Sequence, residues 1–523
     1  MTRVTIADVL LQRAQDTPDA LAYSADGEAI AYGALASDAR RLAAGLAARG
    51  VERGDRCAIV LPTSVDFIRL VYACHLLAAA PVAINPDLPF EAILRRTRLV
   101  RARVAIRARD AHTPADASSP PCPVLTTADL VESGVLQSPR LPEPSDTAFL
   151  QLTSGTTGDP RAAVISHRSL LASLETTNVR LEMRPDDVFA TWVPLHHDLG
   201  FVRYIFGAML AGRPSHLIRP TMGNLRPWID LVSRTRATIT GGPDSAYRLA
   251  ARTVDPAGLD LGRLRFAGNG GEPVRMATIE AFEQRFGRPS IVRPAYGLAE
   301  ATLTVTSTAS GEALRIDAHG AVSCGRALDG IDVRVVDAGG RVTPHGTTGD
   351  VLVRGAPVFD GYFDDDEATR ETLRDGWLRT GDVGSLDAAG YLFVTARARA
   401  LIKRGGVTIA PREIEDAVNR VAGITGSAAI GVVRSAMSAT EDVVVVAEIS
   451  ARLPAEPDAI RARIGAEVVR AVGFAPGQVL LVPMNAIPRT AAGKVRYDEL
   501  RKMVREGWPQ APGPKPHAFP APR

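Results

Sequence analysis

Short apolar runs alternate with amphipathic helical stretches along the N-terminal part of this chain. The runs at residues 56–61, 82–86 and 104–106 have the length and composition of buried strands. Ala, Leu and Arg recur with helical spacing at residues 34–49, ahead of the first of these runs. More strand-like runs follow between residues 186 and 310. Because strands separated by helices form parallel sheets covered by helices, the sequence predicts an α/β fold.

The pattern changes after Glu300. Runs rich in β-forming residues at 332–336, 349–353 and 391–395 are joined by Gly and Asp turns, which indicates a small β-subdomain. A second α/β unit follows, and the last residues, 508–523, carry six prolines and no periodicity. We therefore predict a large N-terminal domain at residues 1–396, a smaller α+β domain at 397–507 and a disordered tail at 508–523.

The composition is that of a globular protein of 523 residues, with 46% hydrophobic and 23% charged residues. A net charge of +3 is too small at this length to indicate binding to nucleic acid or to an acidic membrane. The most apolar stretch, residues 70–85, is interrupted by His75 and Pro81 and falls short of the roughly 20 apolar residues that span a bilayer. Four dispersed cysteines form no zinc motif. We expect a cytoplasmic enzyme with no membrane span and no nucleic-acid partner.

A turn rich in glycine and hydroxyl residues lies between two strand-like runs at residues 153–161. Backbone N–H groups and hydroxyls on one concave surface suit polyphosphate oxygens, and so does the cation of Arg161. The turn is not a Walker loop, because no Gly-Lys-Ser/Thr closes it. A flexible surface loop is the alternative interpretation. The candidate phosphate ligands are Thr153, Ser154, Gly155, Thr156, Thr157, Gly158 and Arg161.

Two further motifs follow strand-like runs and suit a nucleotide. The glycine-rich turn at residues 268–273 would let a flat ring lie against bare backbone. Within residues 296–302, Tyr296 could stack on a base, and Glu300 could hold Mg²⁺, a hard ion that prefers oxygen ligands beside phosphate. A plain strand–helix turn and an ordinary helix with one solvated glutamate are the alternatives.

Three polar positions complete the candidate site residues. The ring of His197 could point at a ligand, although the neighbouring Asp198 could simply cap a helix. Asp382 in a tight turn could accept two hydrogen bonds from a ribose diol, or be an ordinary turn residue. Lys494 is one of only four lysines among 61 Lys and Arg, which indicates a need for a compact, flexible ammonium there. A solvated surface lysine is the alternative.

Six motifs, ending with Pro-Arg-Thr-x-x-Gly-Lys at residues 488–494, occur in an order and spacing that resemble the adenylate-forming superfamily. That superfamily includes acyl-CoA synthetases, adenylation domains and luciferases. Within it, the chain is most similar to the fatty acyl-AMP ligases. This closer resemblance rests on Asn-Gly-Gly-Glu-Pro-Val at 269–274, Gly-Leu-Ala-Glu-Ala-Thr-Leu at 297–303 and Val-Ser-Cys-Gly-Arg at 322–326.

The resemblance implies an N-terminal AMP-binding domain of α/β sheets and a small mobile C-terminal domain. It implies ATP and Mg²⁺ as cofactors, and a reaction of ATP with a carboxylic acid that gives an acyl-adenylate and pyrophosphate. The acyl group would then pass to the phosphopantetheine thiol of an acyl carrier protein. Free coenzyme A is the alternative acceptor. An alternative of another class is a non-catalytic protein that binds nucleotide or acyl-AMP.

By the same resemblance, the motif residues have implied roles. Residues 153–158 would hold the pyrophosphate portion, and Glu300 would hold Mg²⁺. His197 would lie near the carboxylate, and Lys494 would bridge the acid and the α-phosphate, so these two and Glu300 are the implied catalytic residues. Arg399 would be the hinge. The residues implied to line the adenine and ribose are Asn269, Gly270, Gly271, Glu272, Tyr296, Gly297, Asp382 and Arg397.

Three departures from the family pattern are visible. Arg161-Ala162 replaces the usual Lys-Gly after the phosphate loop, which keeps the charge. Ala400 replaces an acidic residue next to the hinge. Only 23 residues separate Glu300 from Cys324. The insertion characteristic of fatty acyl-AMP ligases is therefore largely absent, which leaves both acceptors open.

Overall fold

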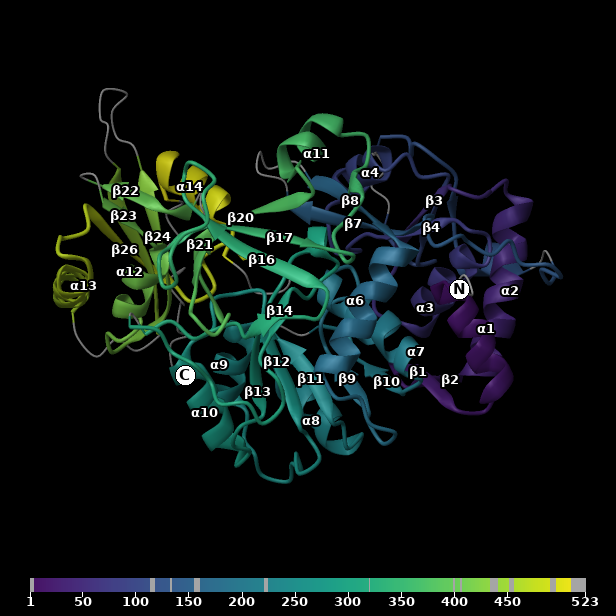
Figure 1. Cartoon of the computed structure of the whole chain (residues 1–523), viewed down its shortest axis with the longest axis horizontal. Helices are drawn as coiled ribbons and strands as arrows, with labels where there is room; N and C mark the ends of the chain where they lie inside the picture. Colours follow the sequence, from purple (N-terminus) through teal and green to yellow (C-terminus); the bar gives the residue numbers. More distant parts are fainter. Residues whose placement is uncertain are drawn as a thin grey trace, which may run out of the picture. The chain divides into compact units, whose positions relative to one another are not determined.

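The computed structural model describes residues 4–112, 118–131, 134–154, 160–220, 224–318, 320–397, 400–404, 407–432, 441–450, 456–489 and 495–508. The chain divides into two compact units, whose elements are labelled in Figure 1. The first unit consists mainly of residues up to Thr395, and the second begins at Ala396.

Seven strands form one sheet of the first unit, in the order β18 (Gly361–Tyr362), β8 (Pro160–Ser166), β7 (Thr147–Ser154), β4 (Ala80–Ala83), β3 (Arg56–Val60), β5 (Val104–Arg107) and β6 (Val124–Leu125). From β7 to β6 all neighbours are parallel, as the alternating pattern predicted. The other edge is antiparallel, because β8 returns from β7 as a hairpin and β18 pairs with β8.

A second sheet has nine strands, in the order β15 (Arg326–Ala327), β14 (Thr306–Ser307), β13 (Val292–Tyr296), β12 (Phe266–Gly270), β11 (Ile239–Gly242), β9 (Phe189–Thr191), β10 (Ser215–Leu217), β1 (Leu21–Ala25) and β2 (Glu28–Ala31). The strand-like runs after residue 186 are confirmed as β9 to β13. Since β11, β12 and β13 are parallel neighbours, the motifs that follow them lie at one edge of the sheet.

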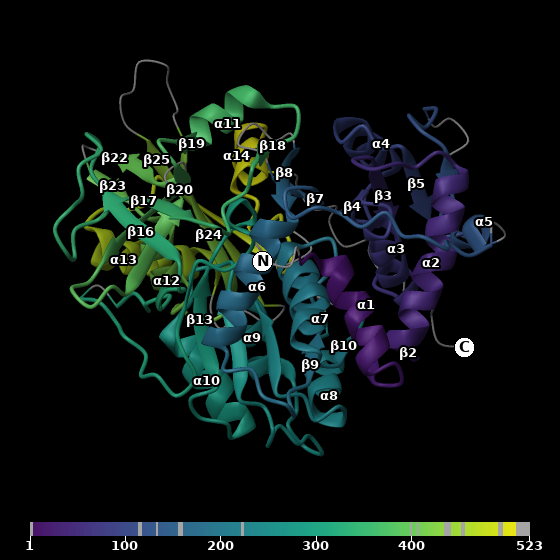
Figure 2. The ribbon, with the colours of Figure 1, turned by 45° about the vertical axis from the view of Figure 1, so that its right-hand side comes forward.

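Helices cover both sheets: α1 (Ile6–Asp16), α2 (Tyr32–Ala48), α3 (Val65–His75), α4 (Phe90–Leu99), α5 (Thr127–Val131), α6 (His167–Arg180), α7 (Ala208–Ala211), α8 (Arg226–Arg234), α9 (Asp244–Thr253) and α10 (Met276–Phe286). Figure 2 shows α2, α3 and α4 around β3, β4 and β5. The apolar stretch at 70–85 is the buried helix and strand that its pattern predicted, α3 and β4. Across the described ranges, no helix has both the length and the apolar character needed to cross a membrane.

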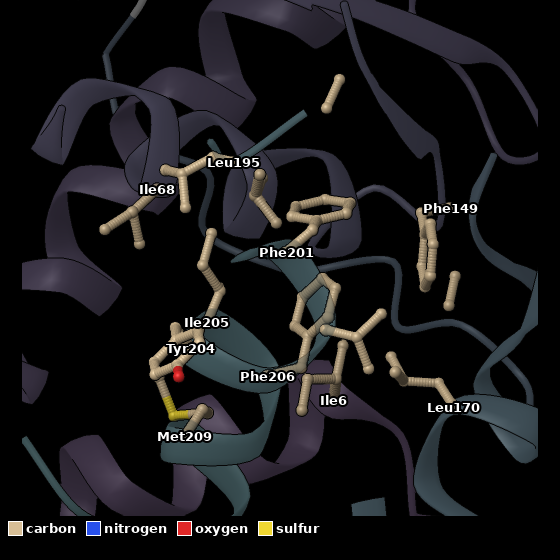
Figure 3. Packing of buried hydrophobic residues seen from close by; sticks show 14 of the residues in the cluster. Ile6, Ile68, Phe149, Leu170, Leu195, Phe201, Tyr204, Ile205, Phe206 and Met209 are labelled. Carbon is tan, nitrogen blue, oxygen red and sulfur yellow. The ribbon is translucent and has the colours of Figure 1, made fainter. Parts of the chain in front are cut away.

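The core of the first unit is built around a π-helix, η1 (Leu199–Gly207), of which every residue after Leu199 is buried. Hydrogen bonds in a π-helix join residues five apart, so Phe201 and Phe206 lie on one face, with ring centroids 4.9 Å apart. Both rings also contact Phe149 of β7, at 5.1 and 5.8 Å (Figure 3). Tyr204 of the same helix packs on Phe189 of β9. The π-helix therefore joins the cores of the two sheets.

The predicted β-subdomain is a five-stranded sheet, which belongs to the first unit except for the last two residues of its strand at 392–397. Its strands are β16 (Ile331–Val336), β17 (Gly349–Gly355), β19 (Leu373–Arg374), β20 (Trp377–Leu386) and β21 (Leu392–Arg397). A short helix, α11 (Asp366–Thr372), precedes β19.

The second unit is a smaller α+β structure. Its main sheet contains β24 (Ile424–Val432), β25 (Asp442–Ile449) and β26 (Gln478–Pro483). A hairpin, β22 (Ile402–Arg404) and β23 (Val407–Ile409), lies outside that sheet. Three helices, α12 (Pro411–Val418), α13 (Pro457–Val472) and α14 (Tyr497–Arg505), complete the unit.

Candidate active site

The predicted phosphate loop connects two paired strands. β7 and β8 are antiparallel, and Thr153 lies opposite Arg161 in their ladder. The loop is thus the tip of a hairpin, whose two ends are held by the sheet. Residues 155–158 and the side chain of Ser154 lie outside the described residues, so their contact with phosphate stays a prediction.

The two charged candidates nearest this hairpin, Arg161 and Glu300, both contact Tyr362. The Tyr362 hydroxyl donates a hydrogen bond of 2.8 Å to Oε1 of Glu300. The Arg161 guanidinium carbon lies 5.4 Å from the centroid of the Tyr362 ring, which is a cation–π distance, and its Nε is 3.2 Å from Oδ2 of Asp365. We call Arg161, Tyr362 and Glu300 the Tyr362 cluster. It joins three segments that are far apart in the sequence.

Glu300 lies in a single turn of 3₁₀ helix, η2 (Ala299–Ala301), rather than in an ordinary helix. Its carbonyl oxygen accepts a 2.9 Å hydrogen bond from the Phe359 amide, which fixes the turn. Burial and the adjacent Glu300 carboxylate raise the pKa of Tyr362, so its hydroxyl remains a donor. A half-buried carboxylate beside the phosphate hairpin fits Mg²⁺, which needs only one or two carboxylates when phosphate oxygens are present. Within the described residues, no group of three or more His, Cys, Asp or Glu side chains is placed to hold a metal ion.

Tyr296 and Asp382 are joined directly. The Tyr296 hydroxyl donates a 2.6 Å hydrogen bond to Oδ2 of Asp382, and both side chains are buried. The predicted tight turn around Asp382 is wrong, because this residue lies inside β20. The strand carries a bulge there: Gly381 has φ +71°, and the ladder with β17 shifts register opposite Val351. A bulge redirects side chains next to it, and here it brings Asp382 to the end of β13.

The Asn-Gly-Gly-Glu motif at residues 269–272 spans the end of β12 and the turn after it, so the predicted turn begins at Gly271 rather than Gly268. The polar side chains of the motif make internal contacts. Nδ2 of the buried Asn269 donates to Asp244 Oδ1 at 3.3 Å, and Glu272 Oε2 accepts from the Ser245 amide at 2.8 Å. Both contacts tie the turn to the start of α9. A Cβ at Gly270 would lie 2.7 Å from the Ala295 carbonyl oxygen of β13, so close strand packing requires this glycine.

His197 lies at the entry to the π-helix. Its Nδ1 is 2.6 Å from Oδ1 of Asp198, and that carboxylate accepts a 2.7 Å hydrogen bond from the Leu199 amide. The prediction that Asp198 caps a helix is therefore confirmed. Burial and the nearby His197 lower the pKa of His196 to about 4, so that neighbour is neutral at physiological pH. A Cβ at Gly200 would lie 2.3 Å from the Pro194 carbonyl oxygen, which explains the glycine after the histidine motif.

Large aromatic side chains are buried at the same edge of the second sheet. Trp192, Tyr204 and Tyr247 are each at most 1% exposed. The Tyr247 hydroxyl donates to the Gly268 carbonyl oxygen at 2.9 Å, and a Cβ at Gly241 would lie 3.0 Å from the Tyr204 hydroxyl. These aromatic side chains lie at the strand ends beside the buried Asn269–Asp244 pair.

Sequence reasoning missed Tyr362 and Asp244. Tyr362 follows a glycine in an unremarkable segment, and only its pairing with β8, almost 200 residues earlier, reveals its place. Gly297 has a detectable constraint, since a Cβ there would collide with the Leu303 carbonyl oxygen. Lys494, Arg399 and the side chain of Arg397 lie outside the described residues, so their implied roles stay predictions.

Known proteins resemble this chain in sequence and in fold. A family model described as AMP-binding enzyme matches residues 10–363. A Caulobacter vibrioides protein, provisionally named as an acyl-CoA synthetase, is 30% identical over 93% of this chain and 92% of its own length. The medium-chain-fatty-acid–[acyl-carrier-protein] ligase JamA of Moorena producens is 27% identical, over 96% of this chain and 95% of its own. A structure from a study of fatty acyl-adenylate ligases of E. coli and L. pneumophila has 25% identity and a TM-score of 0.86, over 96% of this chain and 97% of its own.

Proposed function

This chain belongs to the AMP-binding enzyme family, and we propose that it activates a fatty or related acyl acid and delivers it to an acyl carrier protein. Its α/β fold is that of adenylate-forming enzymes, and enzymes of this family use ATP with Mg²⁺. The chain is therefore an adenylate-forming ligase. The acid, the acceptor and the residue roles are the proposed parts.

Activation has to bring two anions together. A carboxylate oxygen of the acid forms a bond to the α-phosphorus of ATP, while the bond from that phosphorus to pyrophosphate breaks. Because both reactants are negatively charged, the site must supply cations and hydrogen-bond donors that neutralise the developing charge. We assign one cation to Arg161 at the end of the phosphate hairpin and a second to Lys494. Mg²⁺ supplies neutralisation of phosphate oxygens when bound, and Glu300 is the carboxylate that would hold it.

The observation that carries this proposal is the Tyr362 cluster. Arg161, the proposed phosphate ligand, and Glu300, the proposed metal ligand, both contact the Tyr362 side chain. This side chain lies beside β8, the second strand of the phosphate hairpin. The Tyr296–Asp382 pair supports a nucleotide position at the neighbouring strand ends, where Asp382 would accept from the ribose hydroxyls. His197, at the entry to the π-helix, is assigned to the carboxylate side.

An apolar acid is supported by the buried aromatic side chains at the ends of β9, β11 and β12. Trp192, Tyr204 and Tyr247 offer no charged group to a second carboxylate or an amine on the substrate. The name of the JamA relative, a medium-chain fatty acid ligase, points in the same direction.

The acceptor is the less constrained part. The Ala-Glu-Ala-Thr and Ser-Cys-Gly-Arg runs and the acyl-carrier-protein relative favour a carrier protein. A carrier is acidic, so a basic surface on the second unit would help. Two of the arginines available for it are occupied: Arg404 lies 3.6 Å from Asp442, and Arg412 lies 3.2 Å from Asp416. Such a surface would depend on Arg399 and Lys403, whose side chains lie outside the described residues.

Coenzyme A is the second candidate acceptor, and a specific observation favours it. The segment between Glu300 and Cys324 is short and is fastened to β21, because Cys324 donates its amide to the Leu392 carbonyl oxygen at 2.8 Å. The Caulobacter relative carries a coenzyme A ligase name. A non-catalytic binding protein is disfavoured by the assembled Tyr362 cluster.

Pyrophosphate exchange over a panel of carboxylic acids tests the first half-reaction. We expect exchange with medium and long fatty acids and little with short dicarboxylic or amino acids. Purified enzyme is then offered coenzyme A and a phosphopantetheine-bearing carrier protein together, with the best acid. Formation of acyl-carrier product supports the proposal. Rapid acyl-CoA formation with no acyl-carrier product would show instead that coenzyme A is the acceptor. No exchange with any acid would support the non-catalytic alternative.

A further inference from the structure

We propose that Tyr362 is a positioning residue, which aims the Glu300 carboxylate at Mg²⁺ while its ring keeps Arg161 from pairing with that carboxylate. This inference rests on the proposed function of the same site. It assigns a role to a residue that belongs to none of the sequence motifs.

The Tyr362 ring is held firmly enough to act as a reference point. Its backbone pairs with Ala163 of β8, and its amide donates to Thr369 Oγ1 at 2.8 Å. The preceding Gly361 has φ +134°, and a Cβ there would lie 2.7 Å from Thr369 Cγ2, so α11 presses directly on this turn. The ring also meets Phe359 edge-on, with centroids 4.9 Å apart. Strand, helix and aromatic contacts together fix the ring next to the phosphate hairpin.

The hydroxyl fixes the carboxylate. Within the described ranges, no side chain other than Tyr362 hydrogen-bonds to the carboxylate of Glu300. The short 3₁₀ turn positions the Glu300 backbone, but three side-chain torsions remain to be set. A hydrogen bond to Oε1 selects one orientation and directs the other oxygen elsewhere. Preorganised ligands of this kind save the cost of ordering the side chain when the metal binds.

The ring face positions the cation. Arg161 lies over the ring, and its Nε is drawn to Asp365, whose other oxygen accepts from the Ala368 amide at the start of α11. In the described part of the chain, Asp365 is the carboxylate that pairs with Arg161, and Glu300 is not. A direct Arg161–Glu300 ion pair would neutralise the Glu300 carboxylate and leave it unavailable to the metal. The tyrosine binds the two charges through different parts of one side chain, and so keeps them apart.

Tyr362→Phe separates the two roles, because it keeps the ring and removes the hydroxyl. We expect the Mg²⁺ concentration for half-maximal pyrophosphate exchange to rise about tenfold, which is the loss typical of one hydrogen bond to a charged group. The KM for the acid should stay unchanged. A binding readout accompanies the rate: titration calorimetry of ATP without acid should show that the gain in ATP affinity on adding Mg²⁺ shrinks by the same factor. ATP affinity without Mg²⁺ should stay at the wild-type value.

Tyr391→Phe is the matched control. The Tyr391 hydroxyl also donates a hydrogen bond to a glutamate, Glu312, in the same unit, and arginine side chains lie over its ring. Neither Tyr391 nor Glu312 is a proposed site residue. We expect its Mg²⁺ dependence to match the wild type. Tyr362→Leu removes the ring as well, and should additionally weaken ATP binding in the absence of Mg²⁺, because Arg161 is then released toward Glu300.

The outcomes separate this inference from the proposed function. If wild type exchanges pyrophosphate and binds ATP in a Mg²⁺-dependent way, but Tyr362→Phe shows the same Mg²⁺ dependence, the positioning role is refuted and the function stands. Equal losses in Tyr362→Phe and Tyr391→Phe would refute it too, since the effect would then be general. A wild type with no exchange and no Mg²⁺-dependent ATP binding would overturn both.

Discussion

Two regions of the first unit contain the same three residue types in different arrangements. In the Tyr362 cluster, a tyrosine hydroxyl donates to Glu300 and an arginine lies over the ring. In a second group, which we call the Tyr391 cluster, Tyr391 donates to Glu312, and Arg315 and Arg326 lie 4.2 and 5.4 Å from the ring centroid. The chemistry of the contacts is alike in the two clusters.

The difference lies in whether the opposite charges meet. Arg326 is 3.7 Å from Glu312, so the Tyr391 cluster neutralises itself. Burial of Glu312 would raise its pKa, but hydrogen bonds from Tyr391 and the Ala309 amide, together with Arg326, lower it. In the described part of the Tyr362 cluster, no ion pair joins the arginine to the glutamate. The comparison indicates that the self-paired charges of the Tyr391 cluster fasten a loop. The Glu300 carboxylate forms no ion pair within the described residues and remains available to a ligand, whereas Arg161 is paired with Asp365.

Removing the carboxylate charge from each cluster is the strongest way to break this comparison. Glu300→Gln should lower pyrophosphate exchange by roughly 10²–10³-fold, the usual effect of losing one electrostatic contact to the reacting groups. Glu312→Gln should leave exchange nearly unchanged and lower stability slightly. Steady-state pyrophosphate exchange at saturating ATP measures the activity of both variants. Similar losses in the two variants would show that the pairing of charges does not separate site from scaffold.

The aromatic core provides a contrast to both clusters, because its titratable groups are two histidine rings that pack against each other. The rings of His75 and His167 are 5.1 Å apart, and burial lowers the pKa of His75 to about 4. Burial and the nearby His75 lower the pKa of His167 as well. A histidine that titrates near 6.5 when unfolded but near 4 when folded leaves the folded state with fewer protons between these values. The free energy of unfolding is therefore unaffected by His75 protonation above about pH 6.5, and it falls by about 3 kcal/mol between that pH and pH 4.

Urea denaturation at several pH values between 7 and 4 measures this effect. The matched variant is His75→Gln, whose amide can still donate to the Ala148 carbonyl oxygen that the histidine contacts at 2.8 Å. Its free energy of unfolding should depend less steeply on pH than that of the wild type. Parallel pH profiles for the two proteins would contradict the assignment.

Asp382 tests a third tyrosine–carboxylate pair, which should bind the nucleotide rather than metal. Asp382→Ala should weaken ATP binding by about 1.5–3 kcal/mol, because a charged acceptor for the ribose hydroxyls is lost. Asp382→Asn, which keeps an acceptor, should lose less. Calorimetric titration with ATP in the presence and absence of Mg²⁺ is the measurement. In contrast to Glu300→Gln, the loss should be equal in both conditions, and a folded Asp382→Ala protein with wild-type affinity would contradict the ribose role.

The smallest effect is expected at the surface of the Tyr391 cluster. Arg315→Ala removes an exposed arginine from the buried Tyr391 ring, together with its ion pair to Asp387. A cation–π contact at an exposed site is worth about 0.5–1 kcal/mol of stability. ATP affinity should stay at the wild-type value. A change in ATP affinity would mean that this cluster communicates with the nucleotide site, and the contrast between the clusters would have to be redrawn.

Sequence reasoning located the strands and helices well and the local shape of some motifs less well. β3, β5 and β9 to β13 were visible as apolar runs, because a buried parallel strand needs a continuous apolar stretch. The turn proposed around Asp382 was wrong, because one glycine and one aspartate in a run of β-formers look the same whether they make a hairpin turn or a bulge. The partner strand decided between them, through the register shift opposite Val351.

The π-helix was also invisible in the sequence, although its cap was not. Asp198 has the chemistry of a capping residue, and the structure uses it as one. The π-helix places Phe201 and Phe206 on one face, where they pack against Phe149 and Phe67 from other elements. A local pattern cannot contain that information.

By itself, the sequence determined the α/β class, the order of the motifs and the residue types that make adenylate chemistry possible, since these depend on periodicity and on side-chain chemistry. The tertiary structure decided which of those residues meet. Tyr362 joins Arg161 to Glu300, and the bulge in β20 brings Asp382 to Tyr296, through pairings of segments that lie many residues apart. Whether a charge is neutralised or held ready depends on distances of a few ångströms between such segments, and those distances are set by sheet register and packing rather than by neighbours along the chain.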